Sequence, residues 1–407
     1  MSKRLPAFLI GLLAGLAVAV ALVAFVDPIN DLLPDHGQSR TDEARQIIQD
    51  SYFRETDDEE LQDASIDGMV RKISKQNDDK FSHYFNAEAY EEFQEANSGQ
   101  FSGIGLSVSE DKRGLEVVDV FPGSPAQGAD IKPGDLIIAV EGDSLRGVSA
   151  DEASSRIKGE PGTEVEITVV DGETGEKRTI DVERAEVSVP AVQSKMLRAP
   201  GEGDGSGEKI GYVHLSTFSR GAHAELRKKI EDLQDRGAEG LIFDLRGNGG
   251  GLLEEAVLVT SIFQDEGPVV TIEGRERDKQ TFQATGDAID DLGPVAVLVD
   301  GNTASASEIT SAALQENDLA TIIGSTTYGK GVFQEVIELD GGGALDITVG
   351  EYLTADGSSI LGVGVIPDEK VVDKDLADGD DTVLDAGLED VGSRIGSGSD
   401  TDTGDGG

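Results

Sequence analysis

Hydrophobic and polar positions change their period along the chain, and these changes divide it into regions. Between residues 41 and 98, apolar residues recur at three- and four-residue spacing, as in DEELQDASIDGMVRKI, which is typical of amphipathic helices. From 100 to 187 the chain consists of short β-type runs such as LEVVDVF and DLIIAVEG, separated by glycine turns. One helix-like stretch, SADEASSRIK, interrupts them. We therefore predict a helical segment followed by a small β-rich domain.

From residue 209 onward, β-type and helical runs alternate. KIGYVHLSTF, EGLIFDLRG, PVAVLVDG and ATIIGS predict strands, and GAHAELRKKIEDLQDRG, GLLEEAVLVTSIF and SASEITSAALQEN predict the helices between them. Such alternation indicates an α/β core with much parallel sheet. The end of the chain, GSRIGSGSDTDTGDGG from about residue 391, is rich in Gly, Ser and Asp and predicts disorder.

The N-terminus carries a long apolar run. Lys3 and Arg4 precede an uncharged stretch over residues 5–26, which as a helix would be about 33 Å long and would span a bilayer. The sequence VAFVDP is a poor cleavage site, so we predict an uncleaved transmembrane anchor; the alternative is a protein secreted after signal cleavage. In either case the positive-inside rule predicts that the rest of the chain lies outside the cytoplasm.

The composition is strongly acidic. The 407 residues include 80 acidic and 34 basic side chains, giving a net charge of −46, which argues against nucleic acid and anionic membrane surfaces as partners. Our hypothesis is adaptation to a salty milieu, where screening weakens the self-repulsion. Equal stability of the protein in about 0.1 M and about 2 M salt would contradict it. There is no cysteine, which excludes disulfides and thiolate nucleophiles.

Residues 324–334, GSTTYGKGVFQ, match most of a phosphate-binding loop. That loop needs Ser or Thr after the lysine and a helix beyond it, whereas Gly331 follows Lys330 and VFQEVIEL predicts a strand. A nucleotide site is therefore disfavoured. A glycine turn with a surface lysine remains an alternative.

Two other loops follow predicted strands, at the edge where open α/β sheets bind ligands. DLRGNGGG, residues 244–251, precedes a helix and could supply unobstructed N–H groups to an oxyanion, or be a plain tight turn. In DGNTASASEI, Ser305 lies where a strand meets a helix. Ser305 and Glu308 fit a capping box, yet the same position suits a nucleophile, with the Ala306 N–H beside it.

A nucleophilic serine needs a base. The four histidines, at positions 36, 83, 214 and 223, lie outside these loops, which disfavours a Ser-His-Asp triad. Lys330 could serve if burial lowered its pKa from about 10.4 towards about 7–8. Gln334 would share a strand face with Val332 and could hold the lysine ammonium. A competing S-x-x-K pair, Ser155 and Lys158, lies on the helix-like stretch of the β-rich domain and is interpreted as chance.

GNTASASEI, DLRGNGGG and GKGVFQ together resemble the C-terminal processing peptidases, or tail-specific proteases, over most of residues 40–372. The resemblance implies an α/β protease core of crotonase/ClpP-like βα repeats, an inserted β-rich PDZ domain, an N-terminal helical segment and, with the apolar run, a single transmembrane helix. It implies that Ser305 is the nucleophile, Lys330 the general base and Gln334 its orienting residue. The Ala306 N–H and a glycine N–H from the pair Gly250 and Gly251 would form the oxyanion hole.

Residues 101–187 resemble a PDZ domain, with GIGL as the carboxylate-binding loop. The resemblance implies that backbone N–H groups of Gly103, Ile104, Gly105 and Leu106 bind the C-terminal carboxylate of a protein substrate, with no metal or nucleotide cofactor. It also implies self-association and activation through the PDZ domain. The alternative function is a catalytically silent, membrane-tethered PDZ adaptor.

The predicted organisation has five parts. They are a cytoplasmic end and anchor (1–28), a linker and helical segment (29–99), the PDZ domain (100–187), the protease core (188–372) and an acidic, partly disordered tail (373–407). One departure from the family pattern is Glu316, where the resemblance implies aspartate. A second is TADG in place of Thr-Pro-x-Gly.

Overall fold

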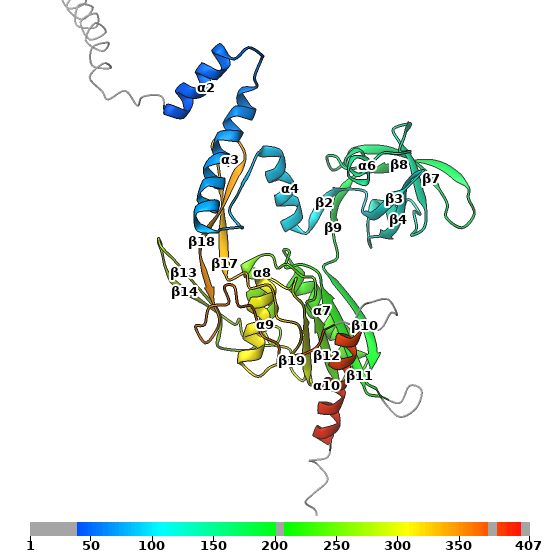
Figure 1. The fold of residues 1–407 in the computed structure, drawn as a ribbon. Coiled ribbons are helices and arrows are strands. Elements are labelled where there is room, and N and C mark those ends of the chain that lie inside the picture. Colours follow the sequence, from blue (N-terminus) through cyan, green and yellow to red (C-terminus); the bar gives the residue numbers. More distant parts are fainter. Residues whose placement is uncertain (1–38, 201–206, 373–380, 400–407) are drawn as a thin grey trace, which may run out of the picture. The chain divides into compact units, whose positions relative to one another are not determined.

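The computed structural model describes residues 39–200, 207–372 and 381–399, which fall into two compact units that divide after Tyr84. The first unit contains helices α2 (Arg40–Ser51) and α3 (Asp58–Asn77) (Figure 1). Ser39 and Asp57 cap their N-termini, since each side chain accepts backbone N–H groups of the first turn. The short strand β1 (His83–Phe85) runs across the division between the units. Helices predicted in the first part of residues 41–98 are thus confirmed.

The second unit begins with helix α4 (Ala87–Ser98) and contains the predicted β-rich domain as an insertion. Strands β2 (Gln100–Gly103) and β9 (Ala185–Ser188) pair antiparallel where the chain enters and leaves this domain. Its sheet has the order β3-β4-β5-β7-β8, with β6 beside β5, and residues such as Leu115, Ile137 and Val165 are fully buried in its core. The elements are β3 (Leu106–Asp111), β4 (Gly114–Val120), α5 (Pro125–Gly128), β5 (Leu136–Val140), β6 (Asp143–Ser144), α6 (Ala150–Ile157), β7 (Glu164–Val170) and β8 (Lys177–Glu183).

The remainder of the second unit is an α/β core around a six-stranded sheet of order β10-β11-β12-β15-β16-β19. Strands β10 and β11 are antiparallel, and all later pairs are parallel, as the alternating pattern predicts. The strands are β10 (Val192–Arg198), β11 (Lys209–Leu215), β12 (Gly240–Asp244), β15 (Val295–Val299), β16 (Thr321–Gly324) and β19 (Glu369–Lys370).

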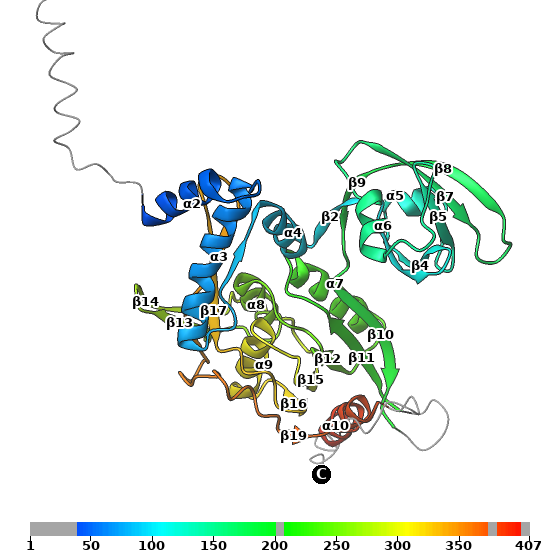
Figure 2. The ribbon, with the colours of Figure 1, turned by 45° about the horizontal axis from the view of Figure 1, so that its top comes forward.

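Helices α7 (Ala222–Asp235), α8 (Leu253–Thr260) and α9 (Ala306–Glu316) cover one face of this sheet (Figure 2). On α7 the apolar residues predicted to share a face, Leu226, Ile230 and Leu233, are all buried in the main core. Strands β12 and β15 are buried at every position, because both faces of the sheet are covered.

A smaller antiparallel sheet stands beside the helices. It contains β13 (Pro268–Gly274), β14 (Arg277–Gln283), β17 (Val332–Glu338) and β18 (Ala344–Leu353), with β18 between β17 and β13. Strand β17 starts directly after the loop that carries Lys330. The predicted strand at this point is confirmed, and no helix follows the lysine as a phosphate-binding loop would require.

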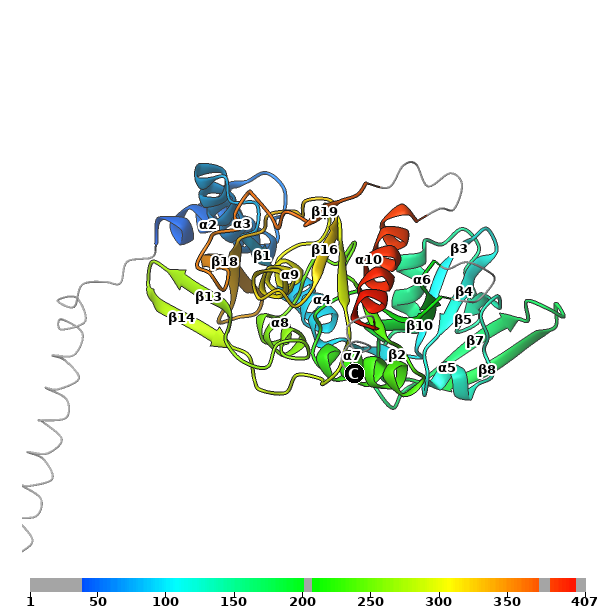
Figure 3. The ribbon, with the colours of Figure 1, turned by 90° about the horizontal axis from the view of Figure 1, so that it is seen from below.

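The end of the chain differs from the prediction. Helix α10 (Thr382–Ser399) covers the second face of the six-stranded sheet, opposite α8 and α9 (Figure 3). Val383 and Val391 are buried there, and Arg394 Nη1 donates to the Val295 carbonyl at 3.2 Å and to Thr321 Oγ1 at 2.6 Å. The Gly/Ser/Asp composition concealed these apolar residues at helical spacing, so disorder from about residue 391 was the wrong interpretation up to residue 399.

The fold prediction is corrected on a second point, the single transmembrane helix. Within residues 39–200, 207–372 and 381–399, no helix is long and apolar enough to cross a bilayer. The apolar run over residues 5–26 lies outside the described residues.

Candidate active site

The three loops singled out in the sequence follow neighbouring parallel strands. Strand β12 pairs with β15 and β15 with β16, so their carboxyl ends lie at one edge of the sheet. The glycine loop leaves β12, the loop to Ser305 leaves β15, and the loop to Lys330 leaves β16. The predicted convergence of these three loops is thus present.

Ser305 occupies a sharp corner between strand and helix. It is the N-cap of α9, it is 5% exposed, and its backbone has φ 56° and ψ −117°. A positive φ is strained for a residue with a Cβ, and such strain is common where a nucleophile is presented at a strand-to-helix turn. The Glu308 carboxylate supplies one half of the predicted capping box, accepting the Ser305 N–H at 2.9 Å.

Tyr352, which the sequence reasoning missed, lines the same cleft as Ser305. Burial raises the pKa of Tyr352 to about 12, against the opposing effect of the hydrogen bond with Ser305. A raised pKa favours the neutral form of the tyrosine beside the serine. Its ring packs on Phe333 at 5.5 Å between centroids, and its N–H donates to the Gly331 carbonyl at 2.8 Å. No local motif marks Tyr352, because only the pairing of β18 brings it to the site.

Lys330 and Gln334 line the same cleft as Ser305, which has a volume of about 920 Å³. Burial lowers the pKa of Lys330, while the nearby carboxylates of Asp346 and Glu308 oppose this effect. A lowered pKa favours the neutral amine that a general base requires. Gln334 lies on β17 and donates from Nε2 to Thr348 Oγ1 at 3.2 Å.

The glycine loop lies against the nucleophile. Gly250 has φ 103°, and a Cβ at this position would come within 2.8 Å of Ser305 Cβ and 2.9 Å of the Ala306 nitrogen. Its N–H donates to Asn248 Oδ1 at 2.8 Å, so this amide is already engaged. Of the predicted pair, Gly251 is therefore the stronger candidate for the oxyanion hole. The requirement for glycine at 250 is steric.

Asn248 is a further residue that the motif analysis passed over. Its Nδ2 donates to the Leu215 carbonyl at 2.8 Å, and its own carbonyl accepts the Ala304 N–H and the Ser307 hydroxyl, both at 3.0 Å. The asparagine thus fastens the glycine loop to β11 and to the corner that carries Ser305.

Known proteins match both parts of the second unit. Residues 209–371 match the model of peptidase family S41, and residues 93–170 match that of the PDZ domain. The carboxy-terminal processing protease CtpA of Bacillus subtilis is 34% identical over 385 residues, which cover 93% of this chain and 79% of that protein. A carboxyl-terminal-processing protease of Picosynechococcus sp. is 36% identical over 296 residues, 72% of this chain and 70% of its own. Among solved structures, the photosystem II D1 C-terminal processing protease aligns at 28% identity with a TM-score of 0.49, covering 88% of this chain and 98% of that one.

The chain belongs to the carboxy-terminal processing proteases of peptidase family S41. It is a serine-type peptidase with a PDZ domain, and its substrates are peptides or proteins. The predicted family and enzyme class are confirmed. A catalytically silent adaptor is no longer the alternative.

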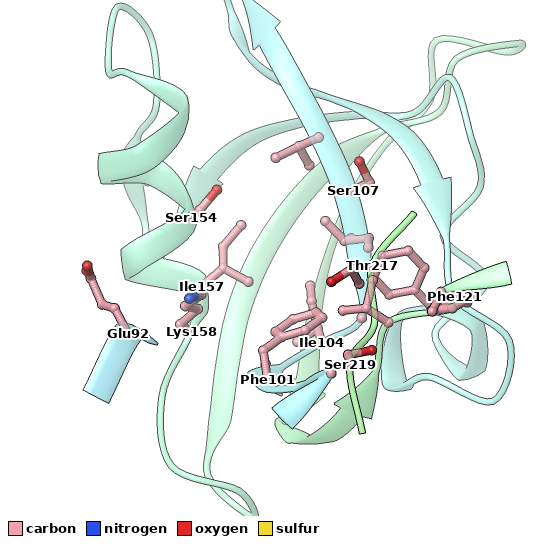
Figure 4. Close-up of a pocket in the computed structure, with 18 residues that line it drawn as sticks. Glu92, Phe101, Ile104, Ser107, Phe121, Ser154, Ile157, Lys158, Thr217 and Ser219 are labelled. Atoms are coloured by element: carbon pink, nitrogen blue, oxygen red, sulfur yellow. The ribbon is translucent and has the colours of Figure 1, made fainter. Parts of the chain in front are cut away.

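The PDZ domain of this protease has a pocket of about 520 Å³ at the predicted carboxylate loop (Figure 4). Gly103, Ile104, Gly105 and Leu106 all line it. Gly105 has φ 81°, and a Cβ there would come within 2.3 Å of Ser124 Cβ, so only glycine fits. Most of the lining is apolar, which suits an extended apolar segment with few polar anchors.

The remaining candidates have structural partners in the protease. Ser155 Oγ donates to the Glu152 carbonyl at 2.8 Å within α6, whereas Lys158 lines the PDZ pocket. Glu316 accepts the Asp356 N–H at 3.0 Å and so joins the end of α9 to the TADG turn. His223 Nδ1 lies 2.8 Å from the Glu255 carboxylate.

Proposed function

We propose that the protease is an endopeptidase that cleaves proteins through a Ser305–Lys330 dyad after capturing their C-terminal tails at the PDZ domain. The observation that carries this proposal is the meeting of Ser305, Lys330 and Gln334 in one cleft, with Ser305 at a strained corner and the pKa of Lys330 lowered by burial. A buried amine with a lowered pKa is the base that a Ser-Lys dyad needs.

The reaction follows from these positions. Neutral Lys330 Nζ takes the proton of Ser305 Oγ as the oxygen attacks the scissile carbonyl carbon. The resulting oxyanion is stabilised by the N–H groups of Ala306 and Gly251. As the C–N bond breaks, Lys330 returns the proton to the leaving amine. Lys330 then activates a water that hydrolyses the acyl-enzyme, and Gln334 keeps the amine oriented.

Tail capture uses the backbone of the PDZ domain. N–H groups over residues 103–106 bind the terminal carboxylate, and the tail adds as a strand beside β3 (Leu106–Asp111). Apolar residues of the tail enter the pocket between β3 and α6. Self-association, which the family resemblance implies, stays a prediction.

The decisive experiment compares the full chain with Ser305→Ala and Lys330→Ala on an unfolded protein that ends in an apolar tail, in high salt. We expect both substitutions to abolish cleavage. Lys228→Ala is the matched control, because Lys228 is exposed on α7 and pairs with Asp232 at 2.8 Å. Cleavage that survives Lys330→Ala would identify another residue as the base.

A further inference from the structure

One fully buried carboxylate joins the two halves of the dyad. Glu308, on the first turn of α9, has no exposed surface. Its Oε2 accepts the Ser305 N–H and the Lys330 N–H, each at 2.9 Å. Its Oε1 accepts the Gly329 N–H at 2.7 Å and the Thr327 hydroxyl. A single oxygen atom thus binds the backbones of both proposed reacting residues.

These contacts go beyond helix capping. A capping box requires only the bond to the N-cap residue, here Ser305. The other three donors belong to the loop after β16, which is separated from Ser305 by all of α9 and β16. The Thr327 hydroxyl also accepts a hydrogen bond from the Val365 N–H at 2.7 Å, which fixes its position.

The buried carboxylate of Glu308 requires these four hydrogen-bond donors. Burying a carboxylate is unfavourable unless several hydrogen bonds replace its water. Four donors to the two oxygens of Glu308 replace that water. One of these bonds, from the Ser305 N–H, also holds the Ser305 backbone, whose φ of 56° is strained. A neutral side chain of the same shape could not do so, because an amide presents one acceptor oxygen and one donor nitrogen.

We propose that Glu308 is a positioning residue of the catalytic centre, fixing the Ser305 corner and the Gly329–Lys330 loop at one separation. This inference rests on the proposed dyad. Misplacement of reacting groups by about 1 Å can reduce turnover by about 100-fold, so the separation of the two loops controls the rate.

Glu308 also acts on the lysine through its charge. Together with Asp346 it opposes the burial that lowers the pKa of Lys330. Besides Asp346 and Lys330, the titratable or charged side chains that line the cleft are Tyr90, Arg220, Glu254, Arg277, Glu335 and Tyr352. Removing the Glu308 charge shifts the pKa of Lys330 further down, which moves the acidic limb of the pH–rate profile to lower pH.

The test is Glu308→Gln in the full chain, with kcat, KM and the pH profile measured on a tail-bearing substrate. We expect kcat to fall roughly 10- to 100-fold with little change in KM, and the acidic limb to move to lower pH. Glu255→Gln is the matched control. Glu255 is 5% exposed in the same core and accepts the N–H groups of Gly221 at 2.7 Å and His223 at 3.1 Å. It should lose stability but keep the parental pH profile.

A parental kcat and pH profile in folded Glu308→Gln would overturn the inference. If that variant does not fold, Thr327→Val decides, because it removes one donor to Glu308, together with the acceptor of the Val365 N–H, and leaves the other three donors. A lower kcat at unchanged KM then supports the inference, and parental kinetics overturn it. Ser305→Ala and Lys330→Ala variants, measured in parallel, distinguish failure of this inference from failure of the proposed dyad. If these two variants retain activity, the proposed dyad is wrong, whatever the result for Glu308→Gln.

Discussion

Gly250 lies so close to Ser305 that a methyl group on its Cα would come within 2.8 Å of Ser305 Cβ. Only a residue without a side chain allows the glycine loop and the serine corner to lie this close together. Since the neighbouring Gly251 N–H is the candidate oxyanion donor, the same contact sets where the oxyanion would be bound.

The first prediction concerns this contact. Gly250→Ala should reduce kcat by about 100-fold or more and lower the free energy of unfolding by about 1–3 kcal/mol, because the added methyl meets Ser305 and φ is 103°. Gly249→Ala is the control, since nothing lies within 4 Å of a Cβ at that position. Steady-state kinetics and urea unfolding of the two variants measure the difference. Equal losses in both would contradict the steric role.

The second prediction concerns pH. Cleavage should rise with pH as Lys330 loses its proton, with a midpoint below the ordinary lysine pKa because burial lowers it. Asp346 raises the pKa of Lys330, so Asp346→Asn should move the midpoint to lower pH. The pH dependence of kcat/KM measures the shift. Asp340→Asn, an exposed aspartate in the β17–β18 turn, should leave the midpoint in place.

The third prediction concerns tail binding. Gly105→Ala should weaken binding of an apolar tail peptide at least tenfold, because its methyl would clash with Ser124 and displace the carboxylate loop. Gly128→Ala in α5 has open space and serves as the control. Fluorescence polarisation with a free-carboxylate peptide and its amidated form measures the effect. If the parent bound both forms equally, carboxylate recognition by this loop would be refuted.

The fourth prediction concerns the last helix. Val391 has no exposed surface, so Val391→Ala should lower the free energy of unfolding by about 2 kcal/mol. Ser397→Ala, on the exposed side of α10, should be close to neutral. Chemical denaturation at constant salt compares them. A neutral Val391→Ala would mean that α10 contributes little to the core.

The sequence was informative where candidate site residues lie in loops that follow predicted parallel strands. Ser305, Lys330 and Gln334 could be chosen because each lies in or after a loop at the carboxyl edge of a parallel sheet, and the structure brings them into one cleft. Tyr352 could not be chosen, because its approach depends on the pairing of β18 with β13 and β17.

The contacts of Glu308 and the helix α10 were not predicted from the sequence, for two different reasons. The capping pattern identified Glu308 but not its contacts to the loop after β16, which depend on tertiary packing. In α10 the apolar positions Val383 and Val391 are spaced for a helix face, but the surrounding Gly, Ser and Asp dominated the composition. Burial against the sheet outweighs the low helix propensity of those residues.

Arg246 connects the glycine loop to helix α10. It lies within that loop, and its guanidinium binds Asp244 at the end of β12 at 2.6 Å and Asp381, the residue before α10, at 2.7 Å. A purification tag or a deletion that pulls α10 from the sheet would therefore loosen the loop that carries the candidate oxyanion donor. Loss of activity after removal of α10 would therefore not by itself implicate a residue of the cleft.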